Sequence, residues 1–329
     1  MKGDRPPSSD VPAGATGGLG AHAFAVLAVS AGVLHLTGMA LAGCLRTEHV
    51  VVDVLVATLP WLGGRALEFV RGAFPAWIFG ALYDGQRFLV GLRGPVHTGD
   101  LESLELRWFP APGGTSWPRW WQSHTWAPLD LLTGLGYATY LAEVGVMALV
   151  LFALRSPRFR TLTWAFLFAG VLGLVGYLLY PAAPPWYVAA HGPGPANPLV
   201  TPSAAGALRF DSLVGVGYFA SFYSRNPNAF AAMPSLHAAF PVVVTFAVWD
   251  RGWRWRVPAA AYAVLIGFSA IYLDHHWVLD VVAGVAVGLA GSALAWAALR
   301  AAGAASASPA VAVAPAPASP EPAERESDA

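Results

Sequence analysis

The sequence predicts an all-α polytopic membrane protein, a bundle of six transmembrane helices with additional interfacial helices between the first and second spans. Of its 329 residues, 56% are hydrophobic and only 12% are charged, whereas a soluble domain carries about 25% charged residues. The apolar residues also form long runs, and about 20 of them are enough for a helix to cross a bilayer. The formal net charge is zero, so nothing indicates a nucleic-acid partner.

Six apolar runs are predicted to span the membrane. In chain order they are 21–45, 129–154, 161–180, 235–250, 257–274 and 277–299. The fourth and fifth are short, and we expect neighbouring helices to support them. Between the first two spans, Val50–Leu62 and Phe74–Leu82 are too short to cross comfortably, which predicts interfacial or re-entrant helices over 46–128. A pair of extra spans in this region is the alternative.

The composition divides the chain into four parts. Residues 1–20 are rich in Pro, Gly and Ser and are predicted to be disordered. Residues 21–128 hold the first span and the interfacial region, and 129–300 form a transmembrane core. Residues 301–329, rich in Ala, Pro and Ser, are predicted to be a disordered cytoplasmic tail.

Arginines in the short loops predict the orientation in the membrane. They lie after the second, fourth and sixth spans, as Arg155, Arg158, Arg160, Arg251, Arg254, Arg256 and Arg300. Because cytoplasmic loops carry an excess of positive charge, we expect both termini in the cytoplasm. The segment 181–234 and the turn 274–276 then face the extracytoplasmic side, and the plasma membrane is the expected location.

Two histidine motifs at the ends of predicted spans carry the candidate chemistry. A titratable group is costly in hydrocarbon and is kept mainly where it has a function. Asp280 lies four residues after His276, on the same face of a helix, so it is placed to orient that imidazole as a nucleophile. His237 follows Pro234 in the first turn of another predicted helix and can act as general acid and then general base. The set suits phosphoryl transfer at helix N-termini, with no metal or other cofactor required.

Simpler interpretations exist for each motif taken alone. A lone histidine at a membrane interface is usually a polar anchor, the interpretation we give to His22, His35, His191 and His275. A His-x-x-x-Asp pair also occurs in metal-ion transporters. The combination is more specific, because Pro-Ser-x-His opens one span and His-x-x-x-Asp opens another, both predicted on the same side of the membrane.

Three segments resemble a known family. Tyr180–Pro185, Asn228–His237 and Tyr272–Asp280 are similar to motifs of the type 2 phosphatidic-acid phosphatase superfamily of integral membrane enzymes. More narrowly, they resemble its inositolphosphotransferase branch, which includes inositol-phosphorylceramide synthases. The resemblance covers about 129–300 and implies that this core is a phosphatase-like catalytic unit acting on lipids.

The resemblance also implies roles for individual residues. His276 matches the histidine that attacks phosphorus, and Asp280 matches the aspartate that orients it. His237 matches the histidine that protonates the leaving oxygen. Ser235 and the backbone amide of Leu236 match the group that holds phosphate oxygens.

The sequence departs from the family pattern where phosphate-binding cations are expected. Ala270 stands where the superfamily usually has an arginine, and Pro185 and Trp186 stand where another is expected. Trp186 is expected to face the lipid or an inositol ring instead. Arg225 is the first candidate to balance the charge of the transition state, and Arg209 is the second.

Tyr180 and Tyr272 are further candidate donors to phosphate, although interfacial aromatic residues commonly serve only as anchors.

Taken together, the motifs and the resemblance predict an outward-facing membrane enzyme that transfers or removes a phosphorylated head group of a phospholipid or lipid phosphate. Alternatives are a lipid-phosphate or isoprenyl-phosphate phosphatase, a metal-ion transporter, and an inactive membrane scaffold. The oligomeric state is not predicted.

Overall fold

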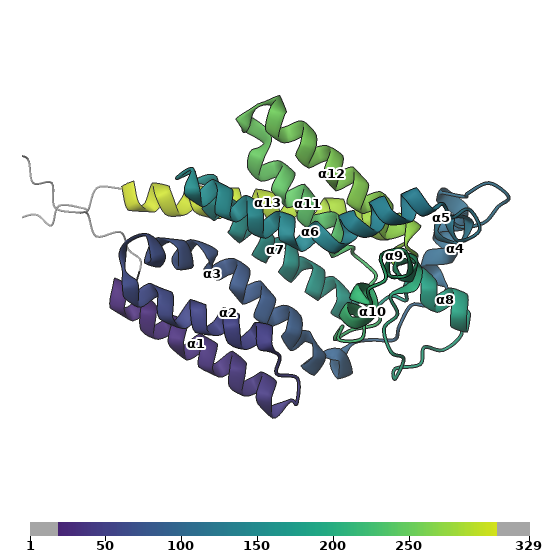
Figure 1. Cartoon of the computed structure of the whole chain (residues 1–329), viewed down its shortest axis with the longest axis horizontal. Helices are drawn as coiled ribbons and strands as arrows, with labels where there is room; N and C mark the ends of the chain where they lie inside the picture. Colours follow the sequence, from purple (N-terminus) through teal and green to yellow (C-terminus); the bar gives the residue numbers. More distant parts are fainter. Residues whose placement is uncertain (1–18, 308–329) are drawn as a thin grey trace, which may run out of the picture.

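The computed structural model describes residues 19–307. Over that range the chain is helical and contains no strand, which confirms the predicted all-α class (Figure 1). Most of the two terminal segments predicted to be disordered lies outside the described residues. The last helix, α13 (Val278–Ala307), continues past residue 300, where the sequence predicted that the tail begins.

Five helices are long and apolar enough to cross a membrane. They are α1 (Ala21–Leu41), α6 (Ala127–Ala153), α7 (Arg158–Leu179), α12 (Trp253–Tyr272) and α13. The predicted count of six is not confirmed, because the fourth predicted span is the helix α11 (Leu236–Val248), which has only 13 residues. At 1.5 Å per residue it is about 20 Å long, shorter than the roughly 30 Å hydrocarbon core.

Helix α11 lies at the centre of the bundle and packs against α7, α12 and α13. Its side chains Phe240, Val243 and Val244 belong to the main hydrophobic core. Glycine lets α13 approach its backbone closely, because a Cβ on Gly284 would lie 2.2 Å from the carbonyl oxygen of Ser235. This contact fixes the start of α11 against the start of α13, the two places where the histidine motifs lie.

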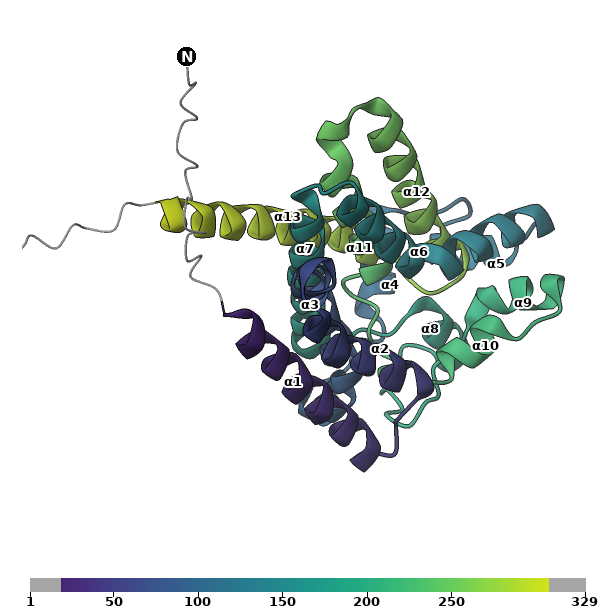
Figure 2. The ribbon, with the colours of Figure 1, turned by 60° about the vertical axis from the view of Figure 1, so that its left-hand side comes forward.

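The first part of the region between the first two predicted spans forms a helical hairpin. Its helices are α2 (Thr47–Thr58) and α3 (Gly64–Gly85), so both predicted apolar stretches are helical and α3 extends well beyond the stretch 74–82. Helix α3 packs along α7, where the ring of Phe79 occupies the space beside Gly170. Figures 1 and 2 show α1, α2 and α3 together on one side of the bundle, with α12 on the opposite side.

Short helices and loops gather at one end of the bundle (Figure 1). These helices are α4 (Asp100–Trp108), α5 (Trp117–Gln122), α8 (Pro185–His191), α9 (Leu208–Val214) and α10 (Tyr218–Tyr223). Short 3-10 segments occupy Leu59–Leu62, Gln86–Phe88, Val90–Leu92, Ala205–Ala207 and Trp249–Arg251.

At the other end of α6, the α6–α7 and α11–α12 loops meet. Arg158 pairs with Asp250 there, and Arg251 donates to Ser156. Two of the arginine clusters used to predict orientation therefore lie together.

Candidate active site

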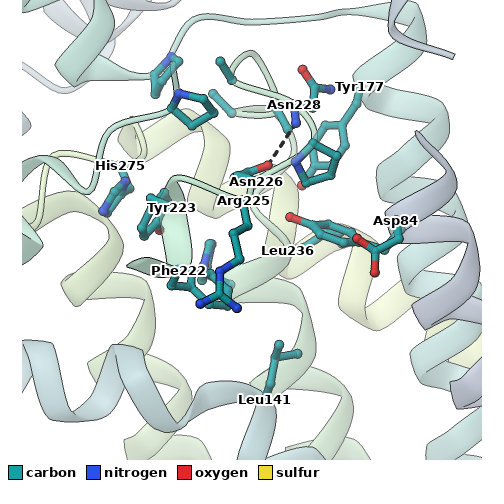
Figure 3. A pocket seen from close by; sticks show the side chains of 18 of the residues that line it. Asp84, Leu141, Tyr177, Phe222, Tyr223, Arg225, Asn226, Asn228, Leu236 and His275 are labelled. Carbon is teal, nitrogen blue, oxygen red and sulfur yellow. Dashed lines mark hydrogen bonds between the residues drawn. The ribbon is translucent and has the colours of Figure 1, made fainter. Parts of the chain in front are cut away.

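A cavity of about 330 Å³ lies between α3, α6, α7 and α11 and the loops that precede α11 and α13. His237 and His276 line it, together with several aromatic side chains. In the view of Figure 3, the side chain of Arg225 extends across the cavity, with His275 and Tyr223 to one side and Asp84 to the other. Three imidazoles, two guanidiniums and two carboxylates therefore share one largely apolar space.

The two histidines predicted to react are in direct contact. Nδ1 of His237 lies 3.1 Å from Nε2 of His276. Nδ1 of His276 lies 2.8 Å from the carbonyl oxygen of Ala232. Since a carbonyl oxygen only accepts, that nitrogen carries the proton of a neutral His276 and Nε2 carries the lone pair. The unprotonated nitrogen of His276 thus faces His237 and the cavity.

Asp280 is fully buried behind His276. Its Oδ2 lies 3.4 Å from Nδ1 of His276 and accepts the backbone N–H of Trp277 at 2.8 Å. Because α13 begins only at Val278, His276 precedes the helix, and the two residues do not form the helical i, i+4 pair that the sequence predicted. The carbonyl of Ala232 provides the closer contact and shares the orienting role assigned to Asp280 alone.

Aromatic rings hold the imidazoles in place. Tyr137 stacks on His237 with ring centroids 4.2 Å apart, and Tyr140 lies 4.4 Å from the same ring. Tyr223 stacks on His275 at 4.3 Å. Burial, and then repulsion from a protonated His276, lower the pKa of His275 to about 3, so it stays neutral. The sequence placed His275 at the interface as an anchor, but it is buried beside the pair formed by His237 and His276.

Three of the predicted substrate-binding residues line the same cavity as the histidines, namely Leu236, Arg225 and Trp186. Ser235 does not. It is fully buried, and its hydroxyl caps α11 by accepting the backbone N–H of Ala238 at 3.3 Å. Its predicted contact with phosphate stays a prediction that the cavity geometry does not support.

The other three predicted residues lie outside the cavity lining. Arg209 is held by Asp130, with Nε 2.6 Å from Oδ1, and by Gln122. The hydroxyl of Tyr272 donates to the same Asp130 oxygen at 2.9 Å, and Tyr180 stacks on the ring of His97. Arg225, rather than Arg209, is therefore the predicted arginine placed to meet a phosphate at the histidine pair.

Sequence reasoning missed the part of the cavity wall that α2 and α3 supply. Arg46, Glu48 and Asp84 all line the cavity, although they lie far from both histidine motifs in sequence. The available signal was their position, because these charges stand immediately at the ends of apolar helical stretches. For 46–128 the sequence predicted interfacial or re-entrant helices and no site residue.

A second buried carboxyl group supports the start of α13. Glu105 of α4 is fully buried, and its Oε2 accepts the backbone N–H of Val278 at 2.7 Å. Burial, partly offset by that hydrogen bond, raises the pKa of Glu105 to about 7, and the negative charge of Asp280 acts in the same direction. Glu105 thus holds the helix that carries Asp280.

We expect Glu105 to make stability fall as pH rises. Its pKa is about 7 in the folded protein against an ordinary value of 4.5, so its contribution to stability is fully present below pH 4.5 and is lost as pH rises through 7. Glu105→Gln keeps an acceptor for Val278 and removes the titration. The variant should therefore exceed the wild type in Tm at pH 8 by about 2–4 °C, measured by thermal unfolding in detergent from pH 5 to 8.

Glu102→Gln, on the same helix but paired with Arg119, is the matched control and should leave the pH dependence as in the wild type. Parallel pH curves for Glu105→Gln and the wild type would show that Glu105 stays ionised.

The long apolar helices show that this is an integral membrane protein. Near one end of the helix bundle, two imidazoles lie in contact in a cavity, as in the active site of an enzyme. Residues 109–294 match the family model described as PAP2 superfamily. The chain belongs to this superfamily, which confirms the resemblance seen in its motifs.

The chain is similar to proteins named as phosphoinositol dihydroceramide or inositol phosphorylceramide synthases. The chain is 34% identical over 255 residues to the phosphoinositol dihydroceramide synthase of Bacteroides thetaiotaomicron, covering 75% of this chain and 83% of the relative. It is 33% identical over 164 residues to the inositol phosphorylceramide synthase of Candida albicans, covering 49% of this chain but only 35% of that relative. A catalytic subunit from Schizosaccharomyces pombe is 29% identical and is covered over 39% of its length. No solved structure matches the chain.

Proposed function

We propose that this protein is a lipid phosphotransferase that moves an inositol phosphate group from a phosphoinositol lipid to the hydroxyl of a ceramide-type acceptor. The observation that carries the proposal is the 3.1 Å contact between His237 and His276 inside a largely apolar cavity. The names of the relatives, one of which is similar over 75% of this chain, indicate which lipids to test.

In the first step, Nε2 of His276 attacks phosphorus and forms an N–P bond. The bond from phosphorus to the diacylglycerol oxygen breaks, and a protonated His237 gives its proton to that oxygen. A bound phosphate favours the protonated imidazole, because opposite charges stabilise each other. Diacylglycerol leaves, and inositol phosphate remains on His276 as a phosphohistidine.

In the second step, the acceptor replaces diacylglycerol. His237, now neutral, takes the proton of the acceptor hydroxyl, whose oxygen forms a bond to phosphorus as the N–P bond breaks. Water in place of the acceptor would make the same chemistry a hydrolysis. The aromatic lining favours transfer, because a site that excludes water protects a reactive intermediate.

Charge in the transition state is balanced by groups on the cavity wall. Such electrostatic stabilisation is usually the largest contribution to catalysis. Arg225 lines the cavity, as does Arg46, and the N-terminus of α11 adds the backbone amides near Leu236. These guanidiniums favour an active enzyme over the inactive scaffold.

The metal-ion transporter has less support. Among the residues that the structure describes, no group of three or more His, Cys, Asp or Glu side chains could hold a metal ion. The described part of the chain therefore offers no set of metal ligands in support of this alternative. We also propose that the site faces the extracytoplasmic side of the plasma membrane with both termini in the cytoplasm. The arginine-rich loops at the other end of α6 support that orientation.

Product analysis tests the proposal directly. Purified protein in mixed micelles would receive phosphatidylinositol as donor, with ceramide, with diacylglycerol or with no lipid acceptor, and the products would be identified by mass spectrometry. We expect an inositol phosphate ester of ceramide that forms only when ceramide is present, together with one diacylglycerol per turnover. Release of water-soluble inositol phosphate at the same rate with and without acceptor would instead establish a phosphatase.

A further inference from the structure

One wall of the active-site cavity comes from outside the family match. The matched region begins at residue 109, whereas Arg46 and Glu48 at the start of α2 and Asp84 at the end of α3 all line the cavity with the histidines. The hairpin thus adds charged groups to a site whose reacting residues belong to the common core. A feature added to a shared core is well placed to select the substrate.

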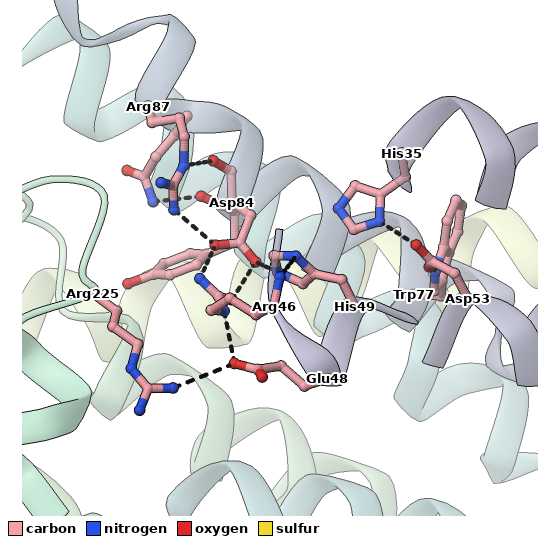
Figure 4. Close-up of polar contacts among 11 residues, drawn as sticks. His35, Arg46, Glu48, His49, Asp53, Trp77, Asp84, Arg87 and Arg225 are labelled. Carbon is pink, nitrogen blue, oxygen red and sulfur yellow. Dashed lines mark hydrogen bonds and ion pairs between the residues drawn. The ribbon is translucent and has the colours of Figure 1, made fainter. Parts of the chain in front are cut away.

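These charged groups form one connected cluster (Figure 4). Asp84 accepts from two guanidinium nitrogens of Arg46, at 2.8 Å and 3.3 Å, and lies 2.9 Å from Nε2 of His49. Arg87 reaches the other oxygen of Asp84 at 3.3 Å. A carboxylate held from three directions keeps a fixed position, so Asp84 fixes Arg46 and, through it, Glu48.

Glu48 connects the hairpin to the loop before α11. Its carboxylate accepts from Nε of Arg46 at 2.7 Å and lies 3.8 Å from Nη1 of Arg225. The side chain is nevertheless 53% exposed, and an ionised carboxylate can accept about four hydrogen bonds. Glu48 can therefore accept hydrogen bonds from a ligand without losing its contact with either arginine.

The chemistry of the cluster favours a neutral ligand with several hydroxyl groups. A second phosphate would meet two carboxylates, and both cavity arginines are already paired with Glu48 or Asp84. A polyol donates to carboxylates and accepts from guanidiniums, so it can use both kinds of group without separating the ion pairs. The amide side chains of Asn226 and Asn228, which also line the cavity, can donate and accept as well.

We propose that Glu48, positioned by Arg46 and Asp84, forms a polyol subsite that binds the inositol ring of the donor lipid. The hairpin α2–α3 thereby sets donor selectivity. This inference rests on the proposed function, because it places the ring beside the phosphorus that His276 attacks. At about 330 Å³ the cavity is at the small end of the range for ligand sites, which suits a head group with its acyl chains outside.

Donor selectivity tests the subsite. Full-length protein would be assayed for transfer to ceramide from phosphatidylinositol and, as a donor with a smaller polyol, phosphatidylglycerol. We expect Glu48→Gln to lower the ratio of kcat/KM for the two donors about tenfold, mainly through a higher KM for phosphatidylinositol, as for the loss of one hydrogen bond to a charged group. Asp84→Asn should act in the same direction. Asp250→Asn, which removes a carboxylate from an arginine pair with 57% exposure at the opposite end of α6, should match the wild type.

A ratio that stays unchanged in Glu48→Gln, or equal losses with both donors, would overturn the polyol subsite. Asp84→Asn can fail to fold because it joins two helices, and the half-exposed Glu48 keeps the test open in that case. Equilibrium binding of water-soluble glycerophosphoinositol separates this inference from turnover. Binding that Glu48→Gln weakens about tenfold supports the subsite even if the wild type proves to hydrolyse rather than transfer, and absence of binding to the wild type overturns it.

Discussion

His276→Ala is expected to lower the rate of head-group transfer at least ~10⁴-fold, because it removes the atom that we propose forms the bond to phosphorus. Removing an enzyme nucleophile typically costs this much or more, and the adjacent His275 is not placed to replace it. His275 is adjacent in sequence but is buried against Tyr223, and its pKa is lowered to about 3. The measurement is the initial rate of product formation from phosphatidylinositol and ceramide, followed by mass spectrometry.

His191→Ala is the matched control. His191 ends α8 at the surface and contacts Tyr187 rather than the cavity, so its loss should leave the rate within twofold of the wild type. Equal elution and Tm of both variants would show that the fold is kept. Undiminished transfer by His276→Ala would falsify the assignment of the nucleophile.

The meeting of His237 and His276 could be predicted because both lie at the ends of apolar runs with the same predicted orientation. Their close partner, the carbonyl of Ala232, could not be predicted, because any residue offers a carbonyl oxygen and only the folded chain shows which one is near. For Arg209, the sequence indicated a role that its position in the fold does not favour. Its charge made it a candidate for phosphate, but Asp130 lies 2.6 Å away and engages it elsewhere.

The helices were easier to predict than their lengths. Apolar composition indicates a buried helix, but it does not separate a helix that crosses a bilayer from one enclosed by other helices. Helix α11 is of the second kind, since α7, α12 and α13 cover it. For α3, charges such as Arg65 and Asp84 interrupt the apolar pattern, so the sequence predicted only the apolar middle of a continuous helix of 22 residues.

His237→Ala should separate the two chemical steps. With phosphatidylinositol, the leaving alkoxide has no proton donor, and loss of general acid catalysis slows the first step by about 10²–10⁴-fold. An aryl ester of inositol phosphate has a leaving group that needs no proton, so His276 can still attack it. The second step still needs His237 to deprotonate the acceptor. The variant should therefore release one aryl group per protein rapidly and then stop.

The halted protein should carry inositol phosphate on His276, visible as an increase in intact mass that is stable in alkali and lost in acid. The double variant His237→Ala/His276→Ala should show neither the burst nor the added mass. Continued turnover of the aryl ester by His237→Ala would mean that another base activates the acceptor. Tyr140 would then be the next residue to test, because its ring lies 4.4 Å from that of His237 and it also lines the cavity.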